Sequence, residues 1–233
     1  MTIRFQPALA CLVLLLTLAS GASGKDVPRV LFLGDAIHGR MMAAAAKELK
    51  GQATLEFPKG TPANDTGAAL ARLDELLGDG KWDLIYFNFG LGDLFYKDPR
   101  TREIRIMSKN AGGVRVTLPK QYEENLEALT QRLKATGAKL MWASITPLVT
   151  VDFFPSFKGN LYEAGSEVAY NEIAARVMAR HDVPINDMHA YVLAQFGPDE
   201  KHPGYSTYDK AFAKKTPLHK PVVRVILEQL GGS

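Results

Sequence analysis

The segment Val30-Leu31-Phe32-Leu33-Gly34-Asp35-Ala36 has the form of a buried strand that ends in a turn. Four apolar residues in a row are typical of a strand that is covered on both faces of a parallel sheet. Gly34 ends this run, and the alanine-rich residues 41–49 predict a helix that stops at Gly51. A strand followed at once by a helix is the repeating unit of parallel α/β sheets.

The same alternation continues along the chain. Short apolar runs predict further strands at 53–57, 84–87, 139–145 and 183–187, and amphipathic or capped segments predict helices at 66–77, 119–136, 167–180 and 221–230. Each strand then needs a crossover helix to lie parallel to the last. We therefore predict a three-layer α/β/α sandwich around a mostly parallel five-stranded sheet, formed by one domain over residues 25–233.

Residues 1–24 have the three parts of a secretory signal peptide: a short basic start, an apolar run and a small-residue cleavage region. We expect a secreted or periplasmic protein without stable membrane insertion after cleavage. The single cysteine, Cys11, lies inside this segment, so the mature chain would have no thiol chemistry and no cysteine-bound metal. The formal net charge is +3 and no basic cluster stands out, which argues against a nucleic-acid partner.

Ligands of doubly wound sheets bind beyond the carboxyl ends of the strands, so the loops at 34–39, 58–66 and 88–95 are the candidate site. The first holds Leu33-Gly34-Asp35-Ala36, the second Gly60, and the third Gly90-Leu91-Gly92-Asp93. A fourth motif, Asp199-Glu200-Lys201-His202-Pro203, precedes the last helix. Their order and placement resemble the four blocks of the SGNH (GDSL-like) hydrolases, over most of residues 29–230.

The resemblance implies hydrolysis of acyl esters, such as O-acetyl groups on carbohydrate, with no cofactor and no metal. Residue 36 would be the nucleophile position, His202 the base and Asp199 its orienting carboxylate. The amides of residue 36 and Gly60, together with residue 92, would hold the oxyanion. Its expected partner is an acylated glycan or another small ester. The sequence predicts no oligomeric state.

Two positions depart from the family pattern. Ala36 stands where the family has its serine, and Gly92 stands where it has an asparagine. Because a hydroxyl nucleophile and a preorganised donor are both lost, serine-esterase activity should be impaired or absent. The alternatives are a non-catalytic glycan-binding or partner-binding protein, and an active esterase lineage with an inactivating change at residue 36.

Several residues keep two interpretations. His219 is an alternative base, since it also lies just before the last helix, although Thr216 replaces the expected aspartate. Asp35 and Asp93 either shape the mouth of the pocket or only cap loops. His38 either reaches the site or faces solvent. The two histidines beside the fifth strand, His181 and His189, are interpreted as surface or packing residues.

Overall fold

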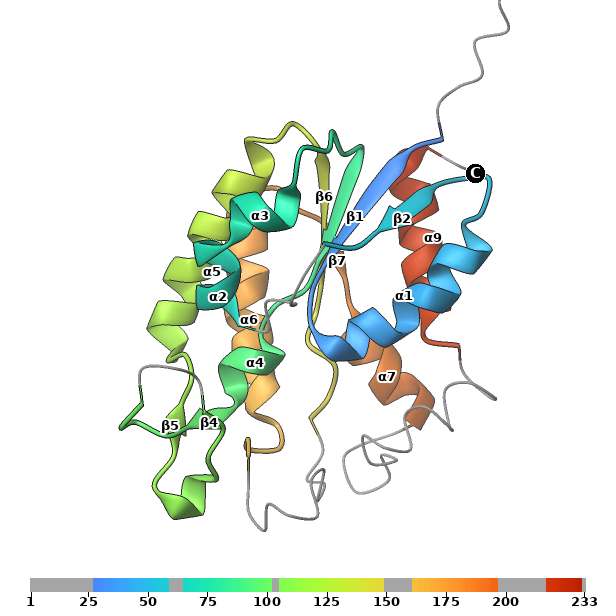
Figure 1. Cartoon of the computed structure of the whole chain (residues 1–233). Coiled ribbons are helices and arrows are strands. Elements are labelled where there is room, and N and C mark those ends of the chain that lie inside the picture. Colours follow the sequence, from blue (N-terminus) through green and yellow to red (C-terminus); the bar gives the residue numbers. More distant parts are fainter. Residues whose placement is uncertain (1–26, 59–64, 102–104, 149–160, 197–216, 232–233) are drawn as a thin grey trace, which may run out of the picture.

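The computed structural model describes residues 27–58, 65–101, 105–148, 161–196 and 217–231 (Figure 1). Five strands form one sheet in the order β2-β1-β3-β6-β7, and every pairing in it is parallel. The strands are β1 Arg29–Leu33, β2 Thr54–Glu56, β3 Leu84–Phe87, β6 Lys139–Ala143 and β7 Ile185–Asn186. The predicted five-stranded parallel sheet is confirmed. The central strands have five, four and five residues, whereas the marginal strands β2 and β7 have three and two.

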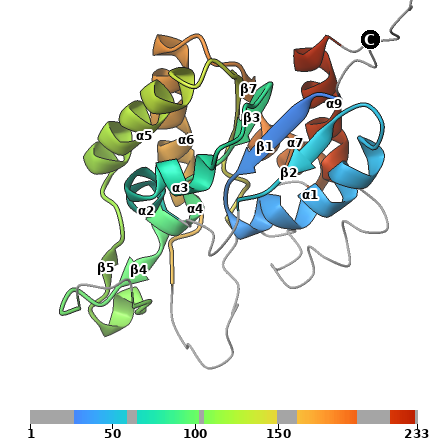
Figure 2. The ribbon, with the colours of Figure 1, turned by 45° about the horizontal axis from the view of Figure 1, so that its top comes forward.

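Helices cover both faces of the sheet, which gives the predicted three layers (Figures 1 and 2). On one face lie α1 and α9, which contact each other, and on the other lie α2, α3, α5 and α6. The bounds are α1 Ala36–Glu48, α2 Thr66–Ala71, α3 Leu73–Leu77, α4 Leu91–Leu94, α5 Pro119–Lys134, α6 Ser166–Arg180, α7 Met188–Phe196 and α9 His219–Leu230. The strands run downward in Figure 1, so their carboxyl ends gather at the lower side of the sheet.

The core forms where the buried strands meet these helices. Residues 84–87 of β3 are all buried, and the rings of Phe87 and Trp142 meet edge to face with centroids 5.1 Å apart. On α1, the buried side chains recur at helical spacing, as expected for a helix with one face on the sheet: His38, Met41, Met42, Ala45 and, just after the helix, Leu49. On α1 the predicted apolar pattern therefore describes the buried face, with one polar residue, His38, included in it.

Several elements differ from the sequence expectation. Helix α1 begins at Ala36 and not at residue 41, because the Asp35 side chain accepts a hydrogen bond from the His38 amide and caps the helix there. The helix expected over 66–77 is two short helices that divide at Arg72. Residues 94–118, where no helix or strand was predicted, contain a small antiparallel pair, β4 (Tyr96–Lys97) with β5 (Val114–Arg115), and a 3₁₀ turn at Lys109–Ala111.

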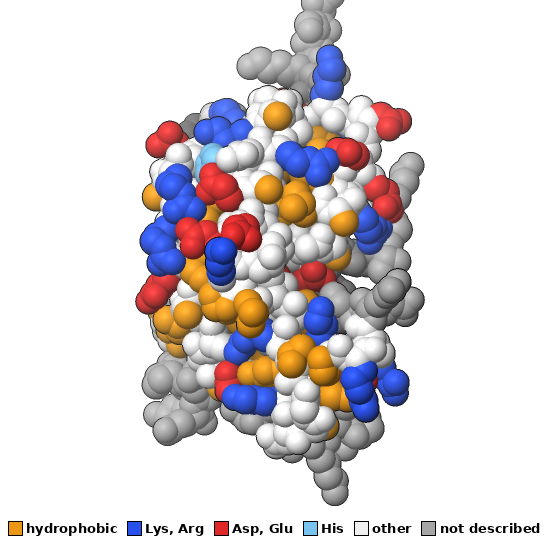
Figure 3. Space-filling view, turned by 90° about the vertical axis from the view of Figure 1, so that its left-hand side faces the viewer, with side chains coloured by type: hydrophobic (Ala, Val, Ile, Leu, Met, Phe, Trp, Pro, Cys, Tyr) orange, Lys and Arg blue, Asp and Glu red, His pale blue; other side chains and the backbone are white. Residues whose placement is uncertain are grey.

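The outer face beside α5 carries charges of both signs, which lie side by side and form no continuous basic patch among the described residues (Figure 3). Ion pairs there link Arg132 to Asp74 and Arg180 to both Glu123 and Glu127. Within the described ranges, no helix is both long enough and apolar enough to span a bilayer.

Candidate functional site

The turn after β1 lies tightly against β3. A Cβ atom on Gly34 would lie 2.7 Å from Cζ of Phe32 and 2.9 Å from the carbonyl oxygen of Asn88, so only glycine fits. Asn88 fixes this approach: its amide donates to the Leu33 carbonyl at 2.8 Å, and its Nδ2 donates to the Ala143 carbonyl at 2.8 Å. The carboxyl ends of β1, β3 and β6 are therefore held together, as the crevice rule for parallel sheets requires.

Ala36 is the first residue of α1 and directly follows the capping residue Asp35. This is the strand-to-helix turn at which the resemblance places a nucleophile. Amide groups in the first turn of a helix have no acceptor within the helix, so this turn can offer N–H donors to a ligand. It cannot offer a hydroxyl at residue 36.

Asp35 and His38 form a buried pair within this first turn. Oδ1 of Asp35 accepts from the His38 amide at 2.9 Å and lies 3.2 Å from Nδ1 of the imidazole. Both side chains are buried, and His38 is completely inaccessible to solvent. His38 thus does not face solvent as one of its two interpretations held; it packs on the core side of α1.

Asp93 joins the loop after β3 to the start of α2. Its carboxylate accepts from the Thr66 amide at 3.0 and 3.1 Å and from Thr66 Oγ1 at 2.6 Å. Asn125 of α5 in turn donates to Thr66 Oγ1 at 3.1 Å. Burial raises the pKa of Asp93 to about 7, although hydrogen bonds from Thr66 and Thr117 oppose the shift. In the described contacts, the Asp93 carboxylate links α4 to the first residue of α2.

The raised pKa of Asp93 predicts a pH-dependent stability. Because the folded-state pKa is about 7 and the ordinary value is 3.8, folding favours the protonated carboxyl. The stabilisation is complete below about pH 4 and is lost as the pH rises toward 7, by up to about 4 kcal/mol. Asp93→Asn is expected to remove this part of the pH dependence when free energies of unfolding are measured in urea from pH 4 to 7. Asp79→Asn, at an exposed position, is the control; equal slopes for wild type and Asp93→Asn would contradict the assignment.

The other candidate residues are placed as follows. Gly92 is buried in α4, one residue before Asp93. His219 begins α9, and its Nε2 lies 3.0 Å from the carboxylate of Glu48. Since a helix rises about 1.5 Å per residue, Glu48 lies roughly 18 Å along α1 from Ala36. The structure does not bring His219 to the turn after β1. Gly60, Asp199 and His202 lie outside the described residues.

Buried polar atoms without a hydrogen-bond partner mark the same edge of the sheet. Within the described part of the chain these atoms are Asp35 Oδ2, His38 Nε2, Asn88 Oδ1, Thr146 Oγ1 and Glu167 Oε2. The first four follow the ends of β1, β3 and β6, and Glu167 lies in the first turn of α6, which starts at that edge. Native proteins leave few buried polar atoms unpaired, and those that persist often have a functional reason. None of the described residues forms a cluster of three or more side chains able to hold a metal ion.

One contact at this edge of the sheet, between His189 and Glu167, was not predicted from the sequence. Nε2 of His189, at the start of α7, lies 3.3 Å from Oε1 of Glu167. The interpretation of His189 as a packing residue missed this partner, which is 22 positions away along the chain. A usable signal was present: His189 lies three residues after the end of β7, and an α/β sheet places its functional loops beyond such strand ends.

The sheet order, the layers and the loops that meet at the carboxyl edge form a doubly wound α/β fold, which solved GDSL-like lipases and acylhydrolases share. The fold implied by the sequence resemblance is therefore confirmed. Neither a protein-family model nor a curated protein sequence matches this chain.

Three solved structures illustrate the likeness. A lipase/acylhydrolase from Enterococcus faecalis is 17% identical with a TM-score of 0.57, and the alignment covers 85% of this chain and 95% of that one. A GDSL-like lipase from Bacteroides thetaiotaomicron is 17% identical with a TM-score of 0.53, covering 87% and 90%. A catalytic mutant of an acetylxylan esterase from Geobacillus stearothermophilus is 16% identical with a TM-score of 0.54, covering 88% and 95%. At these identities the likeness establishes the fold.

Proposed function

We propose that this protein is an exported relative of acyl-ester hydrolases that binds an acylated glycan or another small ester, with serine-dependent hydrolysis impaired or lost. One observation carries the proposal: Ala36 is the first residue of α1, at the turn between β1 and the helix that Asp35 caps. This is the turn at which the family resemblance places the nucleophile, and Ala36 has no hydroxyl.

The chemistry of acyl transfer explains why this position matters. A serine hydroxyl attacks the acyl carbon while a histidine accepts its proton, and preorganised donors hold the oxyanion that develops. Removing the nucleophile alone typically costs about six orders of magnitude in turnover. Gly92 removes a second element, a side-chain amide donor. His202 and Asp199, proposed as base and orienter, would then have no serine to activate.

The proposed substrate class is suggested by the names of the structural neighbours. Among the structural neighbours are acetylxylan esterases. We extend this to acetylated oligosaccharide as the ligand here, bound at the carboxyl edge of the sheet. Export through the segment 1–24 would place the protein where such polysaccharides occur, in the periplasm or outside the cell.

The test combines binding with covalent trapping. Calorimetric titration with acetylated xylo-oligosaccharide is expected to give saturable binding, and the same sugar after chemical deacetylation should bind more weakly. Mass spectrometry after incubation with the ester, or with a fluorophosphonate that labels serine nucleophiles, should show no covalent adduct. A stoichiometric adduct would reveal another working nucleophile, and the absence of binding to either sugar would overturn the proposal.

A further inference from the structure

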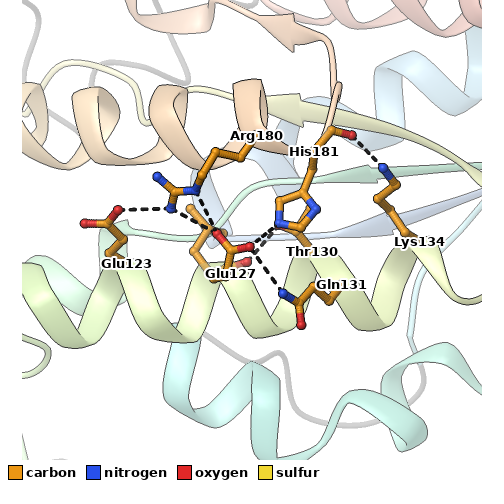
Figure 4. A network of polar contacts seen from close by, with 8 residues as sticks. Glu123, Glu127, Thr130, Gln131, Lys134, Arg180 and His181 are labelled. Atoms are coloured by element: carbon orange, nitrogen blue, oxygen red, sulfur yellow. Dashed lines mark hydrogen bonds and ion pairs between the residues drawn. The ribbon is translucent and has the colours of Figure 1, made fainter.

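Three histidines of the described chain are paired with glutamates, and two of these pairs are ordinary surface contacts. His181 lies against Glu127, which also accepts from Arg180 and from Gln131, as Figure 4 shows. Its carboxylate side chain is 29% exposed. His219 similarly shares the 33% exposed carboxylate of Glu48 with Lys220. In both pairs the carboxylate is partly exposed to solvent and also forms an ion pair with a second cation, Arg180 or Lys220.

The third pair, His189 with Glu167, has the opposite arrangement. The Glu167 side chain is 2% exposed, whereas that of His189 is 19% exposed. No lysine or arginine of the described residues contacts Glu167, and its Oε2 has no partner. A buried carboxylate behind a partly accessible imidazole is the arrangement that orients a histidine for proton transfer.

The position of His189 is fixed by the ends of two strands. Ser144, which directly follows β6, accepts from the His189 amide at 2.9 Å and donates to Oδ1 of Asp187 at 2.9 Å. Asp187, which directly follows β7, also accepts from the Ala190 amide at 2.9 Å and so caps α7. These bonds hold the backbone of His189 at the carboxyl edge of the sheet.

The pair lies beside the elements that carry the candidate site. Helix α4, which contains Gly92, packs against α6, which carries Glu167 in its first turn. Tyr162 meets Phe95, the residue after α4, with ring centroids 5.7 Å apart. Burial raises the pKa of Tyr162 to about 12, and the nearby charge of Glu167 adds to the rise. Glu167, Tyr162 and α4 are therefore neighbours at one end of the sheet.

We propose that His189, oriented by Glu167, is a catalytic base that activates water for direct hydrolysis of an ester without a serine nucleophile. The ring contact described for His189 involves Nε2, and we assign the tautomer in which Nε2–H donates a hydrogen bond to Glu167 and the lone pair lies on Nδ1. This inference rests on the proposed function for its ester substrate. It assigns any ester hydrolysis by the wild type to His189 and Glu167, which take no part in a serine mechanism.

The proposed hydrolysis has two stages, addition of water and loss of the alcohol. Nδ1 of His189 takes a proton from water while the water oxygen bonds to the acyl carbon. The tetrahedral intermediate then breaks its bond to the alcohol oxygen, and the imidazolium returns the proton to that oxygen. The net reaction is ester plus water to carboxylic acid plus alcohol. Since Ser144 and Asp187, at the ends of β6 and β7, hold His189 in place, the reacting carbonyl would lie over the ends of β3 and β6, beside α4.

The experiment measures acetate release from acetylated xylo-oligosaccharide by the full chain. His189→Gln is expected to lower the rate about 10²-fold, the smaller end of what a general base contributes. Glu167→Gln should lower it as well, because the imidazole loses its anionic partner. His181→Gln and Glu127→Gln change a surface His–Glu pair at the other end of α6 and should leave the rate unchanged. In His189→Ala, added imidazole should restore part of the activity, which a merely structural role would not allow.

The outcomes separate this inference from the proposed function. Unchanged turnover in His189→Gln, or the absence of imidazole rescue in a folded His189→Ala, would overturn the inference. Wild-type protein that binds the acetylated sugar but releases no acetate would also overturn it, while leaving the proposed function in place. Protein that neither binds nor hydrolyses the sugar would instead refute the proposed function.

Discussion

Ala36→Ser combined with Gly92→Asn is expected to raise the rate of acetate release by at least roughly 10³-fold, and to make the protein reactive toward fluorophosphonates. The reason is that a lost nucleophile costs about 10⁶ in turnover and a lost oxyanion donor about 10²–10³, so a rebuilt site has much to recover. The turn that would carry the serine is already capped by Asp35 and held close to Asn88.

The single variant Ala36→Ser separates the two contributions, because Gly92 is buried and an asparagine there must find space in α4. Ala43→Ser, at an exposed position on the same helix, controls for an added hydroxyl that cannot act. If the folded double variant releases acetate no faster than the wild type and stays unlabelled by fluorophosphonate, the scaffold has lost more of its catalytic apparatus than two side chains.

Gly90→Ala is expected to cost about 4 kcal/mol of folding stability, from backbone strain and overpacking together. Gly90 has φ of +144°, where side chains are strained, and an added Cβ would lie 2.2 Å from Cδ1 and 2.7 Å from Cγ1 of Ile145. Neighbouring bonds restrict any shift, since Ile145 is fixed through its backbone to Asn171 and the Phe89 carbonyl accepts from Tyr122 at 3.0 Å. The measurement is denaturant unfolding of the variant and the wild type.

Gly137→Ala provides the matched control. Gly137 also has a positive φ, +78°, but an added Cβ there would meet nothing within 4 Å. It should therefore cost only about 1 kcal/mol, the conformational part alone. A Gly90→Ala protein that is no less stable than Gly137→Ala would show that the contact with Ile145 relaxes without cost.

The sheet could be predicted from the sequence because its strands are nearly continuous apolar runs bounded by turn residues. The runs at residues 30–33 and 84–87 lie within β1 and β3. The helix boundaries were harder to predict than the strands, because a capping side chain or a very short connection decides where a helix begins. The cap by Asp35 starts α1 five residues before the alanine-rich segment, and α7 follows β7 after a single residue, so the sequence showed no separate loop before it.

The position of the candidate site in the fold could be predicted from the sequence, but the contacts between its side chains could not. The loops after β1 and β3 meet as expected, since parallel strands end at one edge. The partners of Asp93 and His189, however, are Thr66 and Glu167, at 27 and 22 positions along the chain. Such pairs depend on how loops and helix starts converge in space, and no periodicity in the sequence encodes them.

The short strands at the two sides of the sheet have a consequence for self-association. β2 has three residues and β7 has two, so each flank exposes few free backbone amides and carbonyls with which a second polypeptide could extend the sheet. The long, apolar segments that would template such growth, in β1, β3 and β6, lie in the middle, where both of their neighbours are already in place. We expect this architecture to resist fibril-like stacking even when the protein is concentrated.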